Sequence, residues 1–150
     1  MSNDISKIKA LRESTGLSFD KIKKAMDEAG GDEAKALEVL KSYQGGMAAK
    51  KADRAVQEGI VEAYVHSNKK VGAIVELLCE TDFVARNSEF QDLARGIAMH
   101  LTAMKPADPT EALAQPFVKD PSVTVQDMIN QAIAKLGENI QLGGFSIFEI

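Results

Sequence analysis

The chain has 150 residues, a formal net charge of −4 and a pI near 5.2, so it carries no overall positive field that would attract nucleic acid. Its composition, 45 % apolar and 27 % charged, is that of a folded globular protein and excludes a disordered chain. A single cysteine, Cys79, excludes an intrachain disulfide, and the sequence has neither a bilayer-spanning apolar run nor a signal-peptide pattern. We therefore expect a cytoplasmic protein that contacts neither a membrane nor nucleic acid directly.

Three short helices are predicted in the first 45 residues. Asn3 or Asp4 can cap the first helix, Ser18 the second and Asp32 the third, because short oxygen-bearing side chains accept hydrogen bonds from the free amides of a helix N-terminus. Each helix is expected to end at glycine, at Gly16, Gly30-Gly31 and Gly45-Gly46 respectively. Three helices of this size enclose a very small core, which indicates a binding module more than an enzyme.

The segment over residues 46–58 is polar, alanine-rich and helix-prone, and it predicts a linker helix. From Gly59 onward the spacing of apolar residues changes from the helical period to a period of two. We therefore divide the chain into a three-helix module (1–45), a linker helix (46–58) and a core domain (59–150).

Two strands are predicted at the start of the core domain, over residues 60–66 and 71–79. The run SNKK between them predicts a hairpin turn. One face of the second strand is apolar throughout, whereas Glu76 and Glu80 interrupt the other face, which is therefore expected to be only partly buried.

An amphipathic helix is predicted next, with Ser88 and Gln91 as its capping box and Lys105-Pro106 as its end. All four prolines fall within residues 105–121, which favours a connecting loop over a further core element. A second amphipathic helix follows over residues 123–136.

The chain closes with a strand in which Gly143-Gly144 indicates a bulge or bend. The order of strand, strand, helix, helix and strand predicts an α+β fold, with a three-stranded antiparallel sheet packed by helices. With the N-terminal module, the whole chain is expected to be three helices, a helical linker and this small core.

Residues that carry catalysis or bind metals are sparse. The soft metal ligands are His66, His100 and Cys79, and no two of them have the spacing of a metal site, so solvated or hydrogen-bonded structural roles are favoured for the histidines. Glu80 and Asp82 are paired carboxylates, but no nucleophile or phosphate-binding loop accompanies them, so solvated surface is the favoured interpretation. We expect no metal, no cofactor and no enzymatic activity.

The run CETDFVARN (79–87) lies at the corner between the second strand and the helix after it. Judged from residue pattern alone, Phe83 is expected to be a core residue, since aromatics at strand ends are usually buried, and Asp82 a helix N-cap. The alternative is that Phe83 faces outward as an interface anchor, with Asp82 available to a partner.

Several runs of the sequence resemble elongation factor Ts, the bacterial nucleotide exchange factor for elongation factor Tu, and they occur in that family's order. The corner run ETDFVARNSEFQDLA (80–94) is the most specific of them. The others are TGLSFDKIKKAMDEAGGDEAKALEVL, AAKKADR, EGIVEAYVH and QAIAKLGENI. Together the runs cover nearly the whole chain and resemble a short form of the family with a single copy of the core.

The resemblance implies that the module (1–45) is like a ubiquitin-associated domain and packs on the nucleotide-binding domain of elongation factor Tu. It also implies that Phe83 wedges between partner side chains near the magnesium and phosphate site, with Asp82 beside it, so that GDP leaves without any bond being made or broken. Phe83 is then expected to face outward and not into the core. The partner-binding residues implied in this way are Thr81, Asp82, Phe83, Val84, Arg12, Gly16 and Leu17.

Three departures from the family pattern accompany this resemblance. Ser18 and Phe19 stand where the family commonly has two sulfur-containing residues, the insertion before the last strand has shrunk to residues 105–121, and the final GGFSIFEI lacks the family's frequent arginines. The single core copy implies a homodimer in which two sheets meet across a two-fold axis. An alternative function is that of an adaptor or chaperone-like partner that keeps the module but does not promote exchange.

Overall fold

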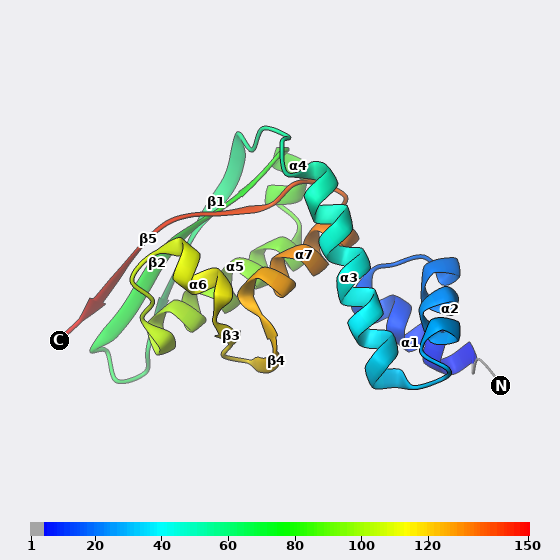
Figure 1. Ribbon diagram of the computed structural model, residues 1–150. Coiled ribbons are helices and arrows are strands. Elements are labelled where there is room, and N and C mark those ends of the chain that lie inside the picture. Colours follow the sequence, from blue (N-terminus) through cyan, green and yellow to red (C-terminus); the bar gives the residue numbers. More distant parts are fainter. Residues whose placement is uncertain (1–4) are drawn as a thin grey trace.

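The computed structural model describes residues 5–150, so the predicted caps Asn3 and Asp4 lie outside the described residues. Figure 1 shows three helices gathered at the N-terminal end of the molecule and a sheet with further helices at the other. Each part has its own cluster of buried apolar side chains, and a long helix joins the two parts. The predicted α+β fold with a three-stranded antiparallel sheet is confirmed.

The N-terminal helices are α1 (Ile5–Thr15), α2 (Phe19–Glu28) and α3 (Glu33–Lys51). Ser18 and Asp32 cap α2 and α3 as predicted, each accepting a hydrogen bond from a first-turn amide. Helix α1 ends at Gly16 and α2 before Gly30-Gly31, where the backbone enters the left-handed conformation that glycine adopts at little cost. The buried apolar side chains of this part are Ile8, Leu11, Leu17, Ile22, Ala25, Met26, Ala36 and Leu40.

Helix α3 does not end at Gly45-Gly46, so that prediction is wrong. The helix continues through both glycines to Lys51, and residues 52–57 then lead to the first strand. A glycine inside a helix costs only about 1 kcal/mol, and burial on both sides of the pair offsets this cost, because Gln44 is buried and Ala48 packs on the larger core. A separate linker helix over 46–58 is therefore not present: residues 46–51 are the last turns of α3, and residues 52–57 are not helical.

The sheet consists of β1 (Glu58–Val65), β2 (Val71–Cys79) and β5 (Gln141–Glu149), with β2 in the middle and both pairings antiparallel. The hairpin turn between β1 and β2 lies at the predicted place, with Lys69 at a φ of 62°. The pairing of β2 with β5 shifts register opposite Glu76. The extra residue lies in β5 at Gly143-Gly144, so the predicted bulge is confirmed.

Helix α5 (Ser88–Met104) packs against β1 and β2, and α7 (Val125–Leu136) lies between α5 and α3. Helix α5 begins at the predicted residue, but its cap is Asn87, whose side chain accepts from the amide of Glu89, and not a Ser88-Gln91 box. Helix α7 has a capping box of Thr124 and Asp127 and ends at Gly137 as predicted.

The proline-rich segment 105–121 is not a bare connecting loop. It contains α6 (Pro109–Ala114), the short strand β3 (Pro116–Phe117) and the start of β4 (Asp120–Thr124). Pro109 occupies the first turn of α6, where its missing amide is no loss, and Asp108 caps that turn. Ala112 and Phe117 are buried in the larger core, so the segment supplies core residues that the proline count obscured.

A buried histidine attaches this segment to α5. His100 Nδ1 accepts a hydrogen bond of 3.1 Å from the amide of Val118, so Nε2 carries the proton and donates to Gln115 Oε1 at 2.9 Å. The imidazole also stacks on Phe117, with ring centroids 5.9 Å apart. The predicted hydrogen-bonded structural role of His100 is confirmed. Within residues 5–150, no helix combines the length and apolar character needed to cross a bilayer.

Candidate functional site

The corner between β2 and α5 contains a single helical turn, α4 (Asp82–Ala85), capped by Thr81, whose hydroxyl accepts a hydrogen bond from the Val84 amide. Val84 and Ala85 point into the core, being 8 % and 7 % exposed, whereas Phe83 between Asp82 and Val84 is 80 % exposed. Successive residues of a helical turn point about 100° apart, so burying one side of the turn leaves Phe83 on the other. The expectation that Phe83 faces outward is confirmed, and the pattern-based expectation of a core phenylalanine is wrong.

Asp82 is the first residue of α4 and not its N-cap, a role that Thr81 takes instead. Its carboxylate forms an ion pair of 3.0 Å with Arg86 one turn later, and both side chains remain half exposed or more. An exposed pair of this kind contributes little to stability, roughly 0.3–0.5 kcal/mol. Asp82 can therefore exchange this partner for another at small cost.

Glu138, immediately after the end of α7, holds the backbone that leads into α4. One of its carboxylate oxygens accepts from the amides of Glu80 and Thr81, at 3.1 and 3.0 Å, and the other accepts from the Thr81 hydroxyl at 2.6 Å. Hydrogen bonds to an ionised carboxylate are about twice as strong as neutral ones. Sequence reasoning missed Glu138, although the polar pair Glu138-Asn139 directly after a helix-ending glycine was a usable signal.

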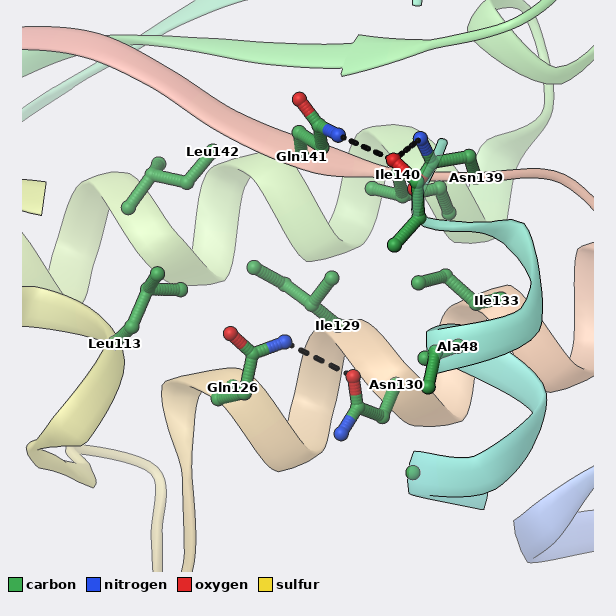
Figure 2. A pocket seen from close by; sticks show the side chains of 13 residues that line it. Ala48, Leu113, Gln126, Ile129, Asn130, Ile133, Asn139, Ile140, Gln141 and Leu142 are labelled. Carbon is green, nitrogen blue, oxygen red and sulfur yellow. Dashed lines mark hydrogen bonds between the residues drawn. The ribbon is translucent and has the colours of Figure 1, made fainter. Parts of the chain in front are cut away.

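Glu80 forms the reciprocal contact, from the end of β2 to the segment after α7. Its carboxylate accepts from the amide of Asn139 at 2.7 Å and lies 3.7 Å from Arg54. The Asn139 side chain in turn donates to the carbonyl oxygens of Arg54 and Ala52, just beyond α3, and Gln141 reaches Ala52 as well (Figure 2). The interpretation of Glu80 as solvated surface was wrong, because the chain brings partners from two distant segments to it.

Cys79 lies beneath the corner, fully buried. Its thiol donates to the Thr81 carbonyl oxygen at 3.2 Å. Burial, and next the nearby negative charge of Glu138, raise the pKa of Cys79 to about 11. The thiol is therefore protonated at neutral pH and serves as a hydrogen-bond donor to the corner, not as a nucleophile.

The second group of predicted binding residues lies at the turn between α1 and α2. Arg12 is exposed in the last turn of α1, whereas Leu17 is 2 % exposed and belongs to the core of the three helices. Gly16 lies against α7, since a Cβ at this position would come within 2.9 Å of the Lys135 Cα. In this group the side chain available at the surface is Arg12, while Leu17 and Gly16 fix the turn.

One cleft brings the turn after α1 close to the segment that follows the corner. A shallow cleft of about 290 Å³ is lined by Glu13 and Gly16 from the first turn, by Asn87 and Glu89 just after the corner, and by Lys135 and Leu136 of α7. Residues more than 70 positions apart in sequence thus line one cleft, together with the end of α7.

A second cleft, of about 490 Å³, lies between α3, α6, α7 and β5 (Figure 2). Its lining consists of small and aliphatic residues with the amides of Gln126, Asn130, Asn139 and Gln141, so it offers no acid, base or nucleophile. Within the described residues 5–150, no three His, Cys, Asp or Glu side chains gather as a metal site would require.

Comparison with known proteins identifies a family to which this chain is similar. The family model for "Elongation factor TS" matches residues 80–150, from the first residue after β2 to the end of the chain. This match assigns the C-terminal part of the chain to a class of translation elongation factors.

Whole-chain relatives extend the similarity to the N-terminal helices. Elongation factor Ts of Rubrobacter xylanophilus is 36 % identical over an alignment of 195 positions, gaps included, that covers 100 % of both chains. Elongation factor Ts of Thermosipho melanesiensis is 39 % identical, covering 95 % of this chain and 96 % of that protein, and that of Carboxydothermus hydrogenoformans is 37 % identical, covering 95 % and 87 %. The chain belongs to the elongation factor Ts family.

Proposed function

We propose that this protein is a guanine nucleotide exchange factor for elongation factor Tu, and that it promotes GDP release by inserting the Thr81–Val84 corner near the partner's magnesium and phosphate site. In this function the protein makes and breaks no covalent bond. It acts through a reciprocal coupling free energy: the factor weakens nucleotide binding, and nucleotide weakens binding of the factor.

The observation that carries the proposal is the exposure of Phe83 on a turn whose next two residues, Val84 and Ala85, are buried and whose start is held by hydrogen bonds. An aromatic ring loses little side-chain entropy when it binds and is worth roughly 2 kcal/mol or more as an interface anchor. Because the turn is already ordered, little binding free energy is lost in ordering it.

The three N-terminal helices supply a second contact in this proposal. Arg12 lies in the last turn of α1, and Gly16, which follows α1, lines the same cleft as Asn87 and Glu89, which follow the corner. A partner domain that reaches both places is held at two points, so that the binding energy of the helices supports insertion of the corner. The division into a module (1–45) and a core domain (59–150) remains part of this proposal, with α3 as the shared element.

Release of labelled GDP from elongation factor Tu, with and without the full chain, tests the proposal. We expect release to accelerate with factor concentration and to reach a maximum. A protein that binds elongation factor Tu but leaves the release rate unchanged would be the adaptor or chaperone-like partner, and that result would defeat the exchange proposal.

We also propose that two copies associate through the outer face of the sheet. Val61 and Phe148 are 64 % and 74 % exposed on this face, and Val65 and Ile74 are also exposed there. A group of exposed apolar side chains on one face is typical of an interaction surface. The other face is occupied by α5. A two-fold axis through the outer face would bury this apolar surface against an identical one.

A further inference from the structure

The question that the corner raises is what fixes the direction of Phe83. Helix α4 has four residues, too few to be stable as an isolated helix. The hydrogen bond that caps this helix is long, since the Val84 amide nitrogen lies 3.4 Å from the Thr81 hydroxyl oxygen. The orientation of the turn must therefore come from contacts with other segments.

Glu138 supplies the shortest and most charged of these contacts. Its carboxylate binds two consecutive amides and one hydroxyl of residues 80–81, immediately before the turn begins. Because one carboxylate binds both amides, the two peptide units cannot rotate independently while these bonds are kept, so Glu138 restrains the backbone from which α4 starts. Gly137, with a φ of 79°, ends α7 and turns the chain toward the corner.

The contact is reciprocal and reaches a third segment. Glu80 accepts from the Asn139 amide at 2.7 Å, and Asn139, which is 2 % exposed, donates to the Arg54 carbonyl oxygen at 2.8 Å. We call Glu80, Glu138 and Asn139 the corner clamp. It joins the end of β2, the end of α7 and the segment after α3, and the corner that carries Phe83 begins at the first of these.

We propose that Glu138 is a positioning residue for nucleotide exchange: it holds the corner backbone so that Phe83 projects in the direction that the partner requires. This inference rests on the proposed exchange function. It assigns to Glu138 no contact with the partner, and it predicts that losing the carboxylate lowers the maximal exchange rate while binding is largely kept, because an incorrectly directed wedge still docks through the rest of the surface.

Two substitutions separate hydrogen bonding from charge. Glu138→Ala removes all three contacts. Glu138→Gln keeps an oxygen for both amides and places its NH₂ toward the Thr81 hydroxyl oxygen, so the geometry survives without the negative charge. Phe83→Ala serves as the reference for loss of the wedge itself, and Asp92→Ala, which removes an exposed carboxylate of α5, serves as the control.

The experiment measures GDP release from elongation factor Tu against factor concentration, together with amide hydrogen exchange of Glu80 and Thr81 in the free factor. For Glu138→Ala we expect a maximal rate about 10-fold lower, a half-saturating concentration within about 3-fold of wild type, and amide exchange at least about 10-fold faster. Glu138→Gln is expected within about 3-fold of wild type in both measurements, and Asp92→Ala is expected to match wild type.

Three results would overturn the inference. The first is a Glu138→Ala protein with wild-type maximal rate or unchanged amide exchange. The second is a folded Glu138→Gln protein whose maximal rate of GDP release is as low as that of Glu138→Ala, because the negative charge of Glu138 and not its hydrogen-bond geometry would then be responsible. The third applies if Glu138→Ala does not fold. In that case Glu138→Asp is measured instead, because its shorter side chain loses at least one of the three donors, and a maximal rate and amide exchange equal to wild type would contradict the inference.

The proposed function can fail separately. If wild type does not accelerate release, or if Phe83→Ala equals wild type, then the exchange proposal is lost. The amide-exchange comparison of Glu138→Ala with Asp92→Ala still decides whether the clamp orders the corner, because that measurement needs no partner.

Discussion

A phenylalanine left 80 % exposed forgoes most of the roughly 2 kcal/mol that burying its ring would contribute to folding. Phe83 is in this position because Val84 and Ala85 occupy the core side of the same turn. A folded protein gains nothing from such an arrangement unless the ring is buried elsewhere, against a partner.

At the scale of this residue, we expect Phe83→Ala to lower the maximal rate of GDP release about 30-fold, the equivalent of losing a 2 kcal/mol anchor. The free energy of unfolding measured in urea should change by less than about 0.5 kcal/mol, because the ring contacts little of its own chain. Val118→Ala, which shortens an exposed apolar side chain far from the corner, should change neither measurement. A large loss of stability in Phe83→Ala would instead indicate that the ring is part of the core.

At the scale of elements, the contact between α1 and α7 depends on a residue without a side chain. Gly16 has a φ of 70° and lies against Lys135, whereas Gly30 has a φ of 62° and open space around it. Gly30→Ala should therefore cost about 1 kcal/mol, from backbone strain alone. Gly16→Ala should cost about 2–4 kcal/mol, because overpacking against α7 is added. Equal unfolding free energies for the two variants would show that the three helices do not press on α7.

The attachment of the segment 105–121 to α5 is expected to depend on pH. Burial lowers the pKa of His100, with the Gln115 hydrogen bond acting weakly in the other direction. The unfolded chain therefore binds a proton that the folded chain resists, and stability should fall as pH drops below about 6.5, the ordinary histidine value. His100→Asn keeps an acceptor for the Val118 amide but does not titrate, so its unfolding free energy should depend less on pH between 7 and 5. The exposed His66, changed to Asn, is the matched control, and an undiminished slope in His100→Asn would contradict the assignment.

At the scale of the whole molecule, the sheet face with Val61, Ile74 and Phe148 is an apolar surface that the single chain leaves exposed. We expect sedimentation at micromolar concentration to give twice the 16.2 kDa mass of the chain. Ile74→Lys should restore the single-chain mass, because burying an unpaired charge in the interface is costly. A single-chain mass for the wild-type protein would rule out the homodimer.

Local chemistry made much of this molecule predictable from sequence. The caps Ser18 and Asp32, the stops at Gly16 and Gly137, the hairpin before Val71 and the alternation along β2 each depend on residues within one or two turns of one another. A side-chain oxygen near a free amide, or an apolar residue at every second position, acts in the same way whatever the rest of the chain does. These features were therefore correctly expected.

The errors lie where distant segments outweigh local preference. Gly45-Gly46 did not end α3 because packing on both sides offsets the cost of two glycines, and the prolines of 105–121 did not prevent Phe117 from entering the core. Neither compensation is visible within a local window of sequence.

By itself, the sequence determined the succession of helices and strands, the three-stranded antiparallel sheet and the family resemblance that singled out Phe83. Only the tertiary structure decided that Phe83 is outside the core and that Glu138, 58 positions from Glu80, holds the corner in place. The physical reason is that exposure and hydrogen-bond pairing are properties of neighbours in space. Residues 138–139 become neighbours of Glu80 only when the folded chain places the end of α7 beside the end of β2.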